Sequence, residues 1–306
     1  MTEQAQAQRV VGLSLPFPGA RRPLEEGAKL GLWDFVLLEG SRISIPPADV
    51  YILAAWDPVY ERLMNIGGKI GVLWTSSPGE LDMEPVEQEY LRSILVDPRV
   101  NFVWFGSKSL ADVYPEKGFY APYPISTGGE LLQTQKQDIM TLFCSTGLKK
   151  NILNQLLAVQ IAQRHSPLVL HTNIQGYDEV LAKIKHVRHG WLDRDVYAGL
   201  LASARMNLAV SWAETYCYQV AECALLGTPS IISSTVPLPG HVVQGPNDPR
   251  EIGAKILWMM DRAGLREPAA VRHEMVLFAQ GQNAICRYTL KERLGIRENE
   301  TSASTP

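Results

Sequence analysis

Residues 212–232 have the sequence WAETYCYQVAECALLGTPSII, and no other stretch of the chain is as informative about its architecture. An apolar run at 206–210 precedes it and a second run, at 230–233, closes it, and both have the character of buried strands. Between them, apolar residues recur at helical spacing, which predicts a helix with one buried face. These residues are Cys217, Val220, Ala221, Ala224 and Leu225. The order strand, loop, helix, strand predicts a βαβ unit of a parallel sheet.

Two carboxylates flank the start of this helix. Thr215 has the residue type of an N-cap and Gly227 that of the residue after a C-cap, so Glu214 lies in the loop before the helix and Glu222 about two turns inside it. Loops beyond the carboxyl ends of parallel strands face the crevice where open α/β sheets bind ligands. The free N–H groups of Thr215 and Tyr216 favour an anion there. The pattern predicts a nucleotide-sugar site, with the pyrophosphate on the helix end and the two acids on sugar and ribose hydroxyls.

A simpler interpretation makes Glu214 an acid of the first helical turn and Glu222 a solvated helix residue. The two acids with their seven intervening residues, followed by the small-residue turn at 227–229, nevertheless resemble the E-x7-E signature of retaining GT-B glycosyltransferases. The closest group is the large one (family 4-like, group 1 C-terminal domain) that includes sucrose, glycogen and mannosyl-transferring enzymes. In its pattern the first Glu contacts the transferred sugar and the second the ribose. The resemblance is good for the C-terminal half and weak for the N-terminal half.

The resemblance implies an α/β fold of the GT-B type: two Rossmann-like parallel-sheet domains face each other across a cleft, and a C-terminal helix returns towards the first domain. We expect an acceptor-side domain over 1–124, a linker over 125–137, a nucleotide-sugar-binding domain over 138–296 and a disordered tail over 297–306. Near the end of the chain, the pattern predicts separate helices at 268–280 and 283–294.

The composition is that of a globular protein: 306 residues, of which 46% are hydrophobic and 20% charged, suit two domains. No apolar run approaches the ~20 residues of a transmembrane helix, and the polar start does not resemble a signal peptide. The four cysteines (Cys144, Cys217, Cys223 and Cys286) lack metal-ligand spacing and fit free thiols of a reducing compartment. We therefore expect a cytoplasmic, soluble protein that does not bind membranes.

Charge is distributed unevenly along the chain, whose net charge is −3. Residues 1–135 contain 11 Lys+Arg against 17 Asp+Glu, and the remainder contains 18 against 15. An acidic first half is a poor surface for a polyanion. The mildly basic second half is the one expected to hold a nucleotide diphosphate.

A second group of donor-site candidates follows the strand expected at 139–144, where Gly147, Lys149 and Lys150 precede a helix. The helix dipole favours acids at this end, so two lysines there indicate a bound anion. In the family pattern an Arg and a Lys of this loop hold the donor diphosphate. Lys150 matches the Lys, and Lys149 or no residue takes the place of the Arg. The alternative is two solvated surface lysines.

One further donor-site candidate, Gly19, and the candidates for the acceptor side come from the first half. A Gly loop after the first strand lets backbone approach a ligand, and by resemblance Gly19 nears the donor phosphate; the alternative is a plain Pro/Gly turn. Trp56, Asp57 and Ser76 follow two further expected strands, so we expect them at the same cleft, where Trp56 would stack on a sugar or base. Alternatively, Trp56 packs in the core and Asp57 caps a helix.

The reaction that the resemblance implies is transfer of a sugar from a UDP- or GDP-linked donor to an acceptor hydroxyl, with retention of anomeric configuration. Glu214 and Lys150 are the expected catalytic residues. Glu214 would orient the sugar, Lys150 would stabilise charge on the leaving phosphate, and Glu222 would anchor the ribose. This scheme requires no cofactor and no metal ion, because lysines and backbone N–H groups supply the positive field.

Several alternatives stay open. An inverting enzyme would need a carboxylate base, for which Asp57 is the best placed, and a GT-B epimerase or phosphorylase would share the donor site. A non-catalytic nucleotide-sugar-binding module is the alternative from another class, and the unusual Tyr216 fits it. The expected acceptor is a small molecule or saccharide; a hydroxymethylated DNA base is a further alternative, because short GT-B chains resemble phage enzymes of that kind. The sequence leaves the oligomeric state open.

Overall fold

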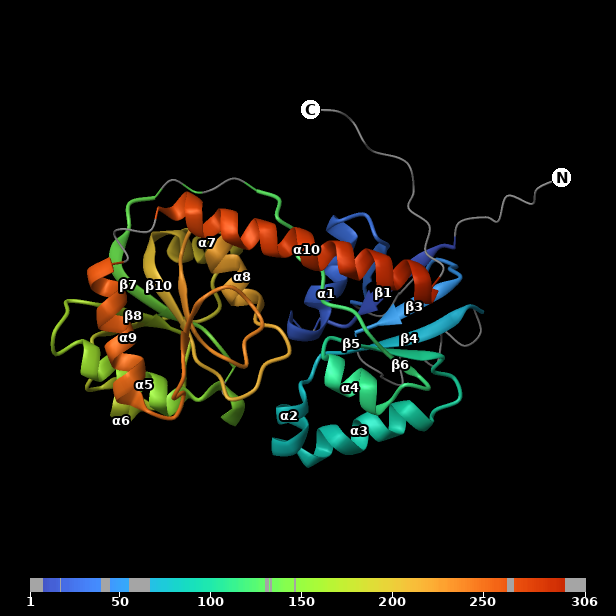
Figure 1. Ribbon diagram of the computed structural model, residues 1–306, viewed down its shortest axis with the longest axis horizontal. Coiled ribbons are helices and arrows are strands. Elements are labelled where there is room, and N and C mark those ends of the chain that lie inside the picture. The colour runs from blue at the N-terminus through green and yellow to red at the C-terminus, as the bar shows by residue number, and fades with distance from the viewer. Residues whose placement is uncertain are drawn as a thin grey trace. The chain divides into compact units, whose positions relative to one another are not determined.

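A computed structural model defines two parallel α/β sheets (Figure 1). The residues it describes are 8–16, 18–39, 45–54, 67–129, 132, 134–145, 147–262 and 267–294. The chain divides into two compact units: unit 1 comprises Met1–Ser126 and Ala279–Pro306, and unit 2 comprises Thr127–Phe278. The predicted α/β class with two parallel sheets is confirmed, and the boundary between the units falls within the predicted linker, 125–137.

Unit 1 is built on a six-stranded sheet with the order β2-β1-β3-β4-β5-β6, in which all neighbours are parallel. Its strands are β1 (Val10–Ser14), β2 (Asp34–Leu37), β3 (Val50–Leu53), β4 (Lys69–Trp74), β5 (Phe102–Phe105) and β6 (Gly118–Tyr120). Its helices before the linker are α1 (Pro18–Lys29), α2 (Pro78–Met83), α3 (Pro85–Val96) and α4 (Lys108–Val113). The strand order changes direction between β1 and β3, so the loops after these two strands flank the crevice of this sheet.

The central strands of unit 1 are largely buried, as expected for a parallel sheet that helices cover on both faces. Every residue of β3 is buried, and the rings of Trp33 and Trp104 meet edge to face with centroids 5.8 Å apart. Local sequence also fixes the start of α2, where Ser77 and Glu80 form a capping box: Glu80 N donates to Ser77 Oγ at 3.3 Å and Ser77 N to Glu80 Oε2 at 2.7 Å. Packing and capping together hold the loop after β4 in place.

Unit 2 is built on a second six-stranded parallel sheet, with the order β12-β11-β10-β7-β8-β9. Its strands are β7 (Gln137–Leu142), β8 (Val169–Thr172), β9 (His186–Arg188), β10 (Ala204–Ala209), β11 (Ser230–Ser233) and β12 (His241–Val243). Its helical segments are the 3-10 turn η2 (Leu148–Lys150), α5 (Ile152–Ala162), α6 (Asp178–Leu181), α7 (Arg194–Ser203), α8 (Tyr218–Leu225) and α9 (Pro249–Arg262). The βαβ unit predicted from 206–233 is thus β10-α8-β11.

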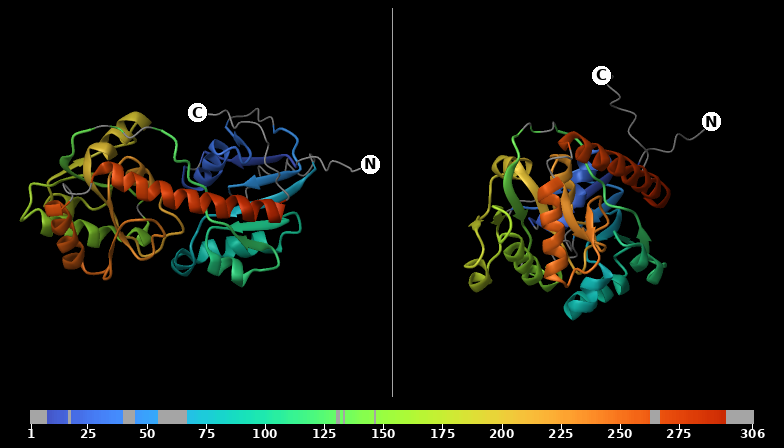
Figure 2. Two further views of the ribbon diagram at one scale, coloured as in Figure 1. Left: turned by 45° about the horizontal axis from the view of Figure 1, so that its top comes forward. Right: turned by 60° about the vertical axis from the view of Figure 1, so that its left-hand side comes forward.

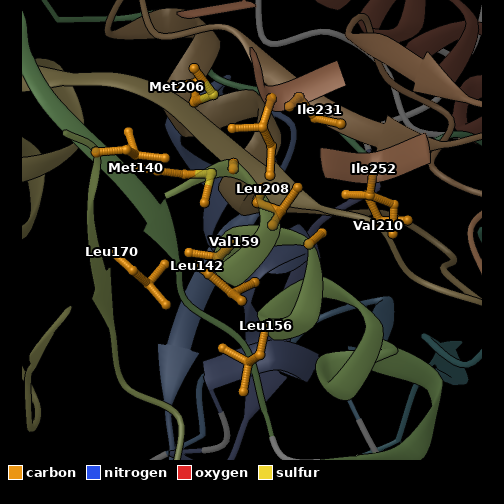
Figure 3. Packing of buried hydrophobic residues seen from close by; sticks show 14 of the residues in the cluster. Met140, Leu142, Leu156, Val159, Leu170, Met206, Leu208, Val210, Ile231 and Ile252 are labelled. Carbon is orange, nitrogen blue, oxygen red and sulfur yellow. The ribbon is translucent and has the colours of Figure 1, made fainter. Parts of the chain in front are cut away.

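One core of unit 2 lies between the central strands and the helices α5 and α9 (Figure 3). Leu142 of β7, Leu208 of β10 and Ile231 of β11 point into it and meet Leu156 of α5 and Ile252 of α9. All of these side chains are almost completely buried. Burial of this apolar surface fixes the two central strands, β7 and β10, side by side, and so fixes the positions of the loops that leave them.

The last helix, α10 (Pro268–Leu294), is one continuous helix, where the sequence predicted two (Figure 1, Figure 2). A glycine inside a helix costs about 1 kcal/mol relative to alanine, and Gly281 lies in the gap between the two predicted helices. Buried positions nevertheless recur at helical spacing on both sides of it: Val271, Met275, Ala279, Cys286, Leu290 and Leu294. Their packing outweighs the local cost of the glycine.

The second half of α10 belongs to unit 1. Asn283 donates to Ile125 O at 2.8 Å and accepts from Ile125 N at 2.8 Å, and Arg287 donates to Leu30 O at 3.2 Å. This confirms the predicted return of the C-terminal helix to the first domain, whereas the predicted bounds 138–296 assign these residues to the second. None of the described helices combines the length and the hydrophobicity needed to cross a membrane. The predicted tail, 297–306, lies outside the described residues.

Candidate functional site

The candidate site lies at the carboxyl edge of the unit 2 sheet, between β7 and β10. From β7 the chain continues to β8 and β9 on one side, and later returns to β10 on the other. The two neighbours are parallel, so the loops that leave them, 143–151 and 210–217, diverge at one point of the sheet edge. Open α/β sheets bind their ligands in the crevice at such a point. The donor residues predicted from the second half of the chain lie on these two loops and on the helix after the second, whereas Gly19, also predicted for the donor, lies in α1 of unit 1.

Lys150 and Glu214 form an ion pair across the two loops. The Lys150 side chain is 17% exposed and the Glu214 side chain 7% exposed, and Ser211 Oγ donates to the same Glu214 oxygen at 2.9 Å. Burial by itself lowers the pKa of Lys150, but the charge of Glu214 reverses the effect, so the pKa is raised and the amine stays charged. The sequence proposed both residues for the site, and the structure brings them into contact.

Lys149 adds a second cation to this pair. Its pKa is lowered by burial and by the charge of Lys150, while Glu214 acts in the opposite direction. The backbone of Lys149 is held from the neighbouring loop, because Trp212 N donates to Lys149 O at 2.8 Å. Lys149, Lys150 and Glu214 form what we call the charged cluster: two cations and one anion at the sheet edge, with the Lys150 and Glu214 side chains largely buried. Its net positive charge suits an anionic ligand.

The turn that carries the lysines is short and tightly bonded. Gly147 precedes the turn η2 in an extended conformation, and its carbonyl accepts from Lys150 N at 3.0 Å. Gln155 Nε2 donates to Lys150 O at 2.6 Å, and Gln155 Oε1 accepts from Val210 N at 2.9 Å. A single buried amide on α5 therefore links the lysine turn to the start of the loop that carries Glu214.

The helix after Glu214 begins later than predicted. Thr215 is not its N-cap: α8 starts at Tyr218, Cys217 takes the cap position, and the Cys217 side chain makes no capping hydrogen bond. Glu214 is bound by Lys150 and Ser211, which holds residues 214–217 in an irregular loop. Thr215 is 7% exposed within that loop, and the rings of Tyr216 and Tyr218 lie 4.8 Å apart. Both predicted donor residues, Thr215 and Tyr216, therefore lie beside the charged cluster in sequence and outside the helix.

Glu222 lies about one turn inside α8 and is half buried. Tyr197 of α7 donates from Oη to Glu222 Oε2 at 3.5 Å. The pKa of Tyr197 is raised above its ordinary range by burial and by the nearby Cys223 and Glu222, so the phenol stays protonated and serves as a donor. The Tyr197 ring packs edge to face on Phe143, the first residue after β7.

A row of rings continues from Phe143 along the sheet edge. Phe143 packs against His189 with centroids 5.9 Å apart, and His189 Nε2 lies 3.0 Å from His171 Nδ1. Burial and the neighbouring His189 lower the pKa of His171. Sequence analysis did not select Phe143 or Tyr197. The available signal was weak: Phe143 is an aromatic residue directly after a central strand, where a side chain faces the crevice.

The site residues predicted from the first half of the chain have mixed outcomes. Trp56 and Asp57 lie outside the described residues. Ser76 lies in the loop after β4, and its Oγ donates to Glu87 Oε2 at 2.5 Å. Gly19 was expected in a loop but lies in the first turn of α1, because the helix begins at Pro18, a residue type favoured at that position.

Among the residues that the structure describes, no group of three or more His, Cys, Asp or Glu side chains is arranged to hold a metal ion.

No protein-family model matches the sequence, and no curated protein matches it. Solved structures do. An α,α-trehalose 6-phosphate synthase from Burkholderia multivorans has a TM-score of 0.62 at 10% identity, over 95% of this chain and 97% of that one. The E. coli trehalose-6-phosphate structure with bound UDP-2-fluoro glucose has a TM-score of 0.61 at 10% identity, over 93% and 98%. The UDP-forming α,α-trehalose-phosphate synthase of Burkholderia xenovorans, in complex with glucose-6-phosphate, has a TM-score of 0.59 at 11% identity, over 81% of this chain and 74% of that one. This similarity identifies the fold, and with its two parallel sheets the chain has the GT-B fold.

Proposed function

We propose that this protein is a glycosyltransferase that moves a sugar from a UDP- or GDP-linked donor to an acceptor hydroxyl. The observation that carries the proposal is the Lys150–Glu214 ion pair beside Lys149, at the point of the sheet edge where α/β folds bind ligands. The structural neighbours support the donor class, since one of them was solved with UDP-2-fluoro glucose bound. Retention of anomeric configuration is part of the proposal.

In the proposed donor complex the phosphates bind at the charged cluster. An ammonium group has three N–H donors, so Lys150 retains donors for phosphate oxygens while it holds Glu214. A fixed cation beside the leaving phosphate stabilises the charge that develops when the glycosidic bond breaks. Lys149 adds to this field, and the scheme therefore requires no metal ion and no cofactor.

The two acids divide the rest of the donor between them. Glu214 would accept hydrogen bonds from hydroxyls of the transferred sugar. Lys150 and Ser211 fix the position of its carboxylate. Glu222 would bind the ribose, with Tyr197 holding one carboxylate oxygen. Carboxylates suit this role since each oxygen accepts more than one hydrogen bond.

For the acceptor we propose a small molecule or saccharide. One neighbour was solved in complex with glucose-6-phosphate, which supports this class. A DNA acceptor would need cations for its phosphates, but two arginines of α1 are engaged by acids of their own helix: Arg21 pairs with Glu25 at 3.1 Å and Arg22 with Glu26 at 3.2 Å. Paired arginines offer little net charge to a phosphate backbone, so a DNA base is a secondary candidate. The free thiols of the four cysteines favour a cytoplasmic location.

A thermal-shift panel of UDP, GDP, ADP and their sugars, on the wild type and on Glu222→Ala, tests the proposal. A ligand at ~100 times its dissociation constant adds about 2.7 kcal/mol to the unfolding free energy, which raises the melting temperature by several degrees. We expect one nucleotide to stabilise the wild type and Glu222→Ala to lose that stabilisation.

The pattern of responses separates the alternatives. Product detected by mass spectrometry with a screened acceptor distinguishes an enzyme from a non-catalytic module, and the anomeric configuration of the product distinguishes retention from inversion. If no nucleotide in the panel stabilises the wild type, the result would contradict the proposed donor site.

A further inference from the structure

Asn151 has an unusual backbone conformation. Within the described part of the chain it is the one non-glycine residue with a positive φ, at φ 52° and ψ 37°. This left-handed conformation costs most L-residues roughly 1–2 kcal/mol, and Asn is among the few that tolerate it. The residue stands between the lysine turn η2 and the first residue of α5, so its conformation sets the angle at which the turn leaves the helix.

The side chain of Asn151 is used for tertiary contacts. It is 2% exposed, it donates from Nδ2 to Pro246 O at 2.6 Å, and it accepts at Oδ1 from Asn154 Nδ2 at 2.7 Å. Asn is a favoured N-cap residue, yet Asn151 makes no capping hydrogen bond to the first turn of α5. Its amide is therefore committed to the segment after β12, and helix capping does not explain why an Asn occupies this position.

The segment after β12 is bound at a second point. Trp212 Nε1 donates to Asn247 Oδ1, and Trp212 is the residue whose backbone N–H holds Lys149 O. Residues 246–247 thus contact both loops of the candidate site, one through Asn151 and the other through Trp212. The lysine turn is therefore bound on one side by Trp212, in the loop after β10, and Asn151 at its end is bound by Pro246, in the loop after β12.

We propose that Asn151 is a positioning residue of the donor site: by its left-handed backbone and its bond to Pro246 it holds Lys149 and Lys150 where the donor diphosphate binds. The inference rests on the proposed function. It makes Pro246 and Asn247 part of the same assembly, although neither carries a charge. Substitution of a residue that positions the phosphate-binding lysines should weaken the binding of ligands that carry phosphates and leave the binding of ligands without phosphates unchanged. Substitution of a purely structural residue should weaken the binding of all ligands equally.

The test is calorimetric titration of the folded protein with UDP, uridine, GDP and guanosine. In Asn151→Gly the left-handed backbone remains accessible while both side-chain bonds are lost. We expect the dissociation constant of the bound nucleoside diphosphate to rise about 3- to 10-fold, the range of one lost hydrogen bond, and that of the nucleoside to stay within about twofold.

Gln163→Ala is the matched control. Gln163 stands at the other end of the same helix, and its Nε2 donates to Leu168 O at 2.9 Å and to Lys185 O at 2.8 Å, at the opposite edge of the sheet. Gln163→Ala likewise loses side-chain hydrogen bonds to backbone groups, one part-buried and one exposed, so the melting temperature of this variant falls while its diphosphate affinity stays at the wild-type value. Asn247→Ala serves as a second variant should Asn151→Gly fail to fold, with the same selective loss expected.

The outcomes are distinguishable. Wild-type diphosphate affinity in Asn151→Gly, or an equal loss for diphosphate and nucleoside, would overturn the positioning role while leaving the proposed function intact. In the event that Asn151→Gly does not fold, wild-type affinity in Asn247→Ala has the same meaning. A wild type that binds neither UDP nor GDP would overturn both the proposed function and this inference.

Discussion

Lys150 and Glu214 form an ion pair although 64 positions of sequence separate them. They meet because β7 and β10 are neighbours in the sheet, and each residue lies on the loop that leaves its strand. The geometry of this pair depends on the order of the strands in the sheet. Because both side chains are largely buried, loss of either partner should lower the free energy of unfolding. Its two members are also the proposed catalytic residues, so stability and ligand binding are linked at one contact.

Lys150→Met should destabilise unit 2, because it leaves Glu214 buried without its cation. Breaking a fully buried pair from one side costs about 3–5 kcal/mol, and we expect a smaller loss here because the Lys150 side chain is 17% exposed. Urea unfolding measures the change. In a double-mutant cycle with Glu214→Gln, the double variant should lose less stability than the sum of the two single variants. Additive losses would show that the pair has no coupling energy.

Tyr197→Phe should weaken nucleotide binding about two- to fivefold while leaving the fold intact, since it removes one long hydrogen bond to Glu222 and keeps the ring on Phe143. The measurement is the dissociation constant of the nucleotide found in the thermal-shift panel. Tyr177→Phe is the control, because the Tyr177 ring packs on the unit 2 core. Equal effects of the two substitutions would exclude a specific role for Tyr197.

Lys136 should make stability depend on pH in the alkaline range. Burial lowers its pKa from 10.5 to about 8, and its amine donates to Ala202 O at 2.8 Å and Thr228 Oγ1 at 2.6 Å. Below pH 8 the amine is charged in the folded and the unfolded states, and the cost of burying it is constant. Between pH 8 and 10.5 the unfolded chain binds more protons, so this group makes stability rise with pH.

The variant Lys136→Met isolates this contribution. The unfolding free energy of the wild type minus that of the variant should increase between pH 7.5 and 9.5 in chemical denaturation. A difference that is flat or falls over this range would show that the Lys136 amine stays charged in the folded protein.

Gly27→Ala should destabilise unit 1. A Cβ at this position of α1 would lie 1.9 Å from Trp33 Cζ2, and Trp33 is buried with its Nε1 bonded to Leu24 O at 2.9 Å. Overpacking of this kind costs about 1–3 kcal/mol. Gly199→Ala in α7 is the opposite case, because a Cβ there meets nothing within 4 Å and helical propensity improves by about 1 kcal/mol. Melting temperatures should move down for Gly27→Ala and up for Gly199→Ala.

The sequence contained enough information for the βαβ unit at the centre of unit 2, and it selected the three residues that the structure brings together in the charged cluster. Apolar runs of strand length alternating with helical periodicity indicated β10-α8-β11, and two lysines at an unfavourable helix end indicated an anion site. The contact between Lys150 and Glu214 was beyond this reasoning. It depends on strand order, which periodicity along the chain does not contain.

The local errors have the same origin. Thr215 fits an N-cap by residue type, but Lys150 and Ser211 bind Glu214 from outside the segment and delay the helix to Tyr218. Gly281 fits a helix break, but buried residues on both sides continue the helix through it. In both places tertiary contacts outweigh a local preference of about 1 kcal/mol.

The helix α10 also determines the order in which the protein can be completed during synthesis. Unit 2 is one uninterrupted run, Thr127–Phe278, whereas unit 1 includes residues from Ala279 onward. Translation therefore delivers all of unit 2 before it delivers Asn283, whose side chain binds both backbone groups of Ile125. The strands of unit 1 therefore emerge first, but this unit is completed last. Until α10 has been synthesised, Ile125 lacks its contact with Asn283.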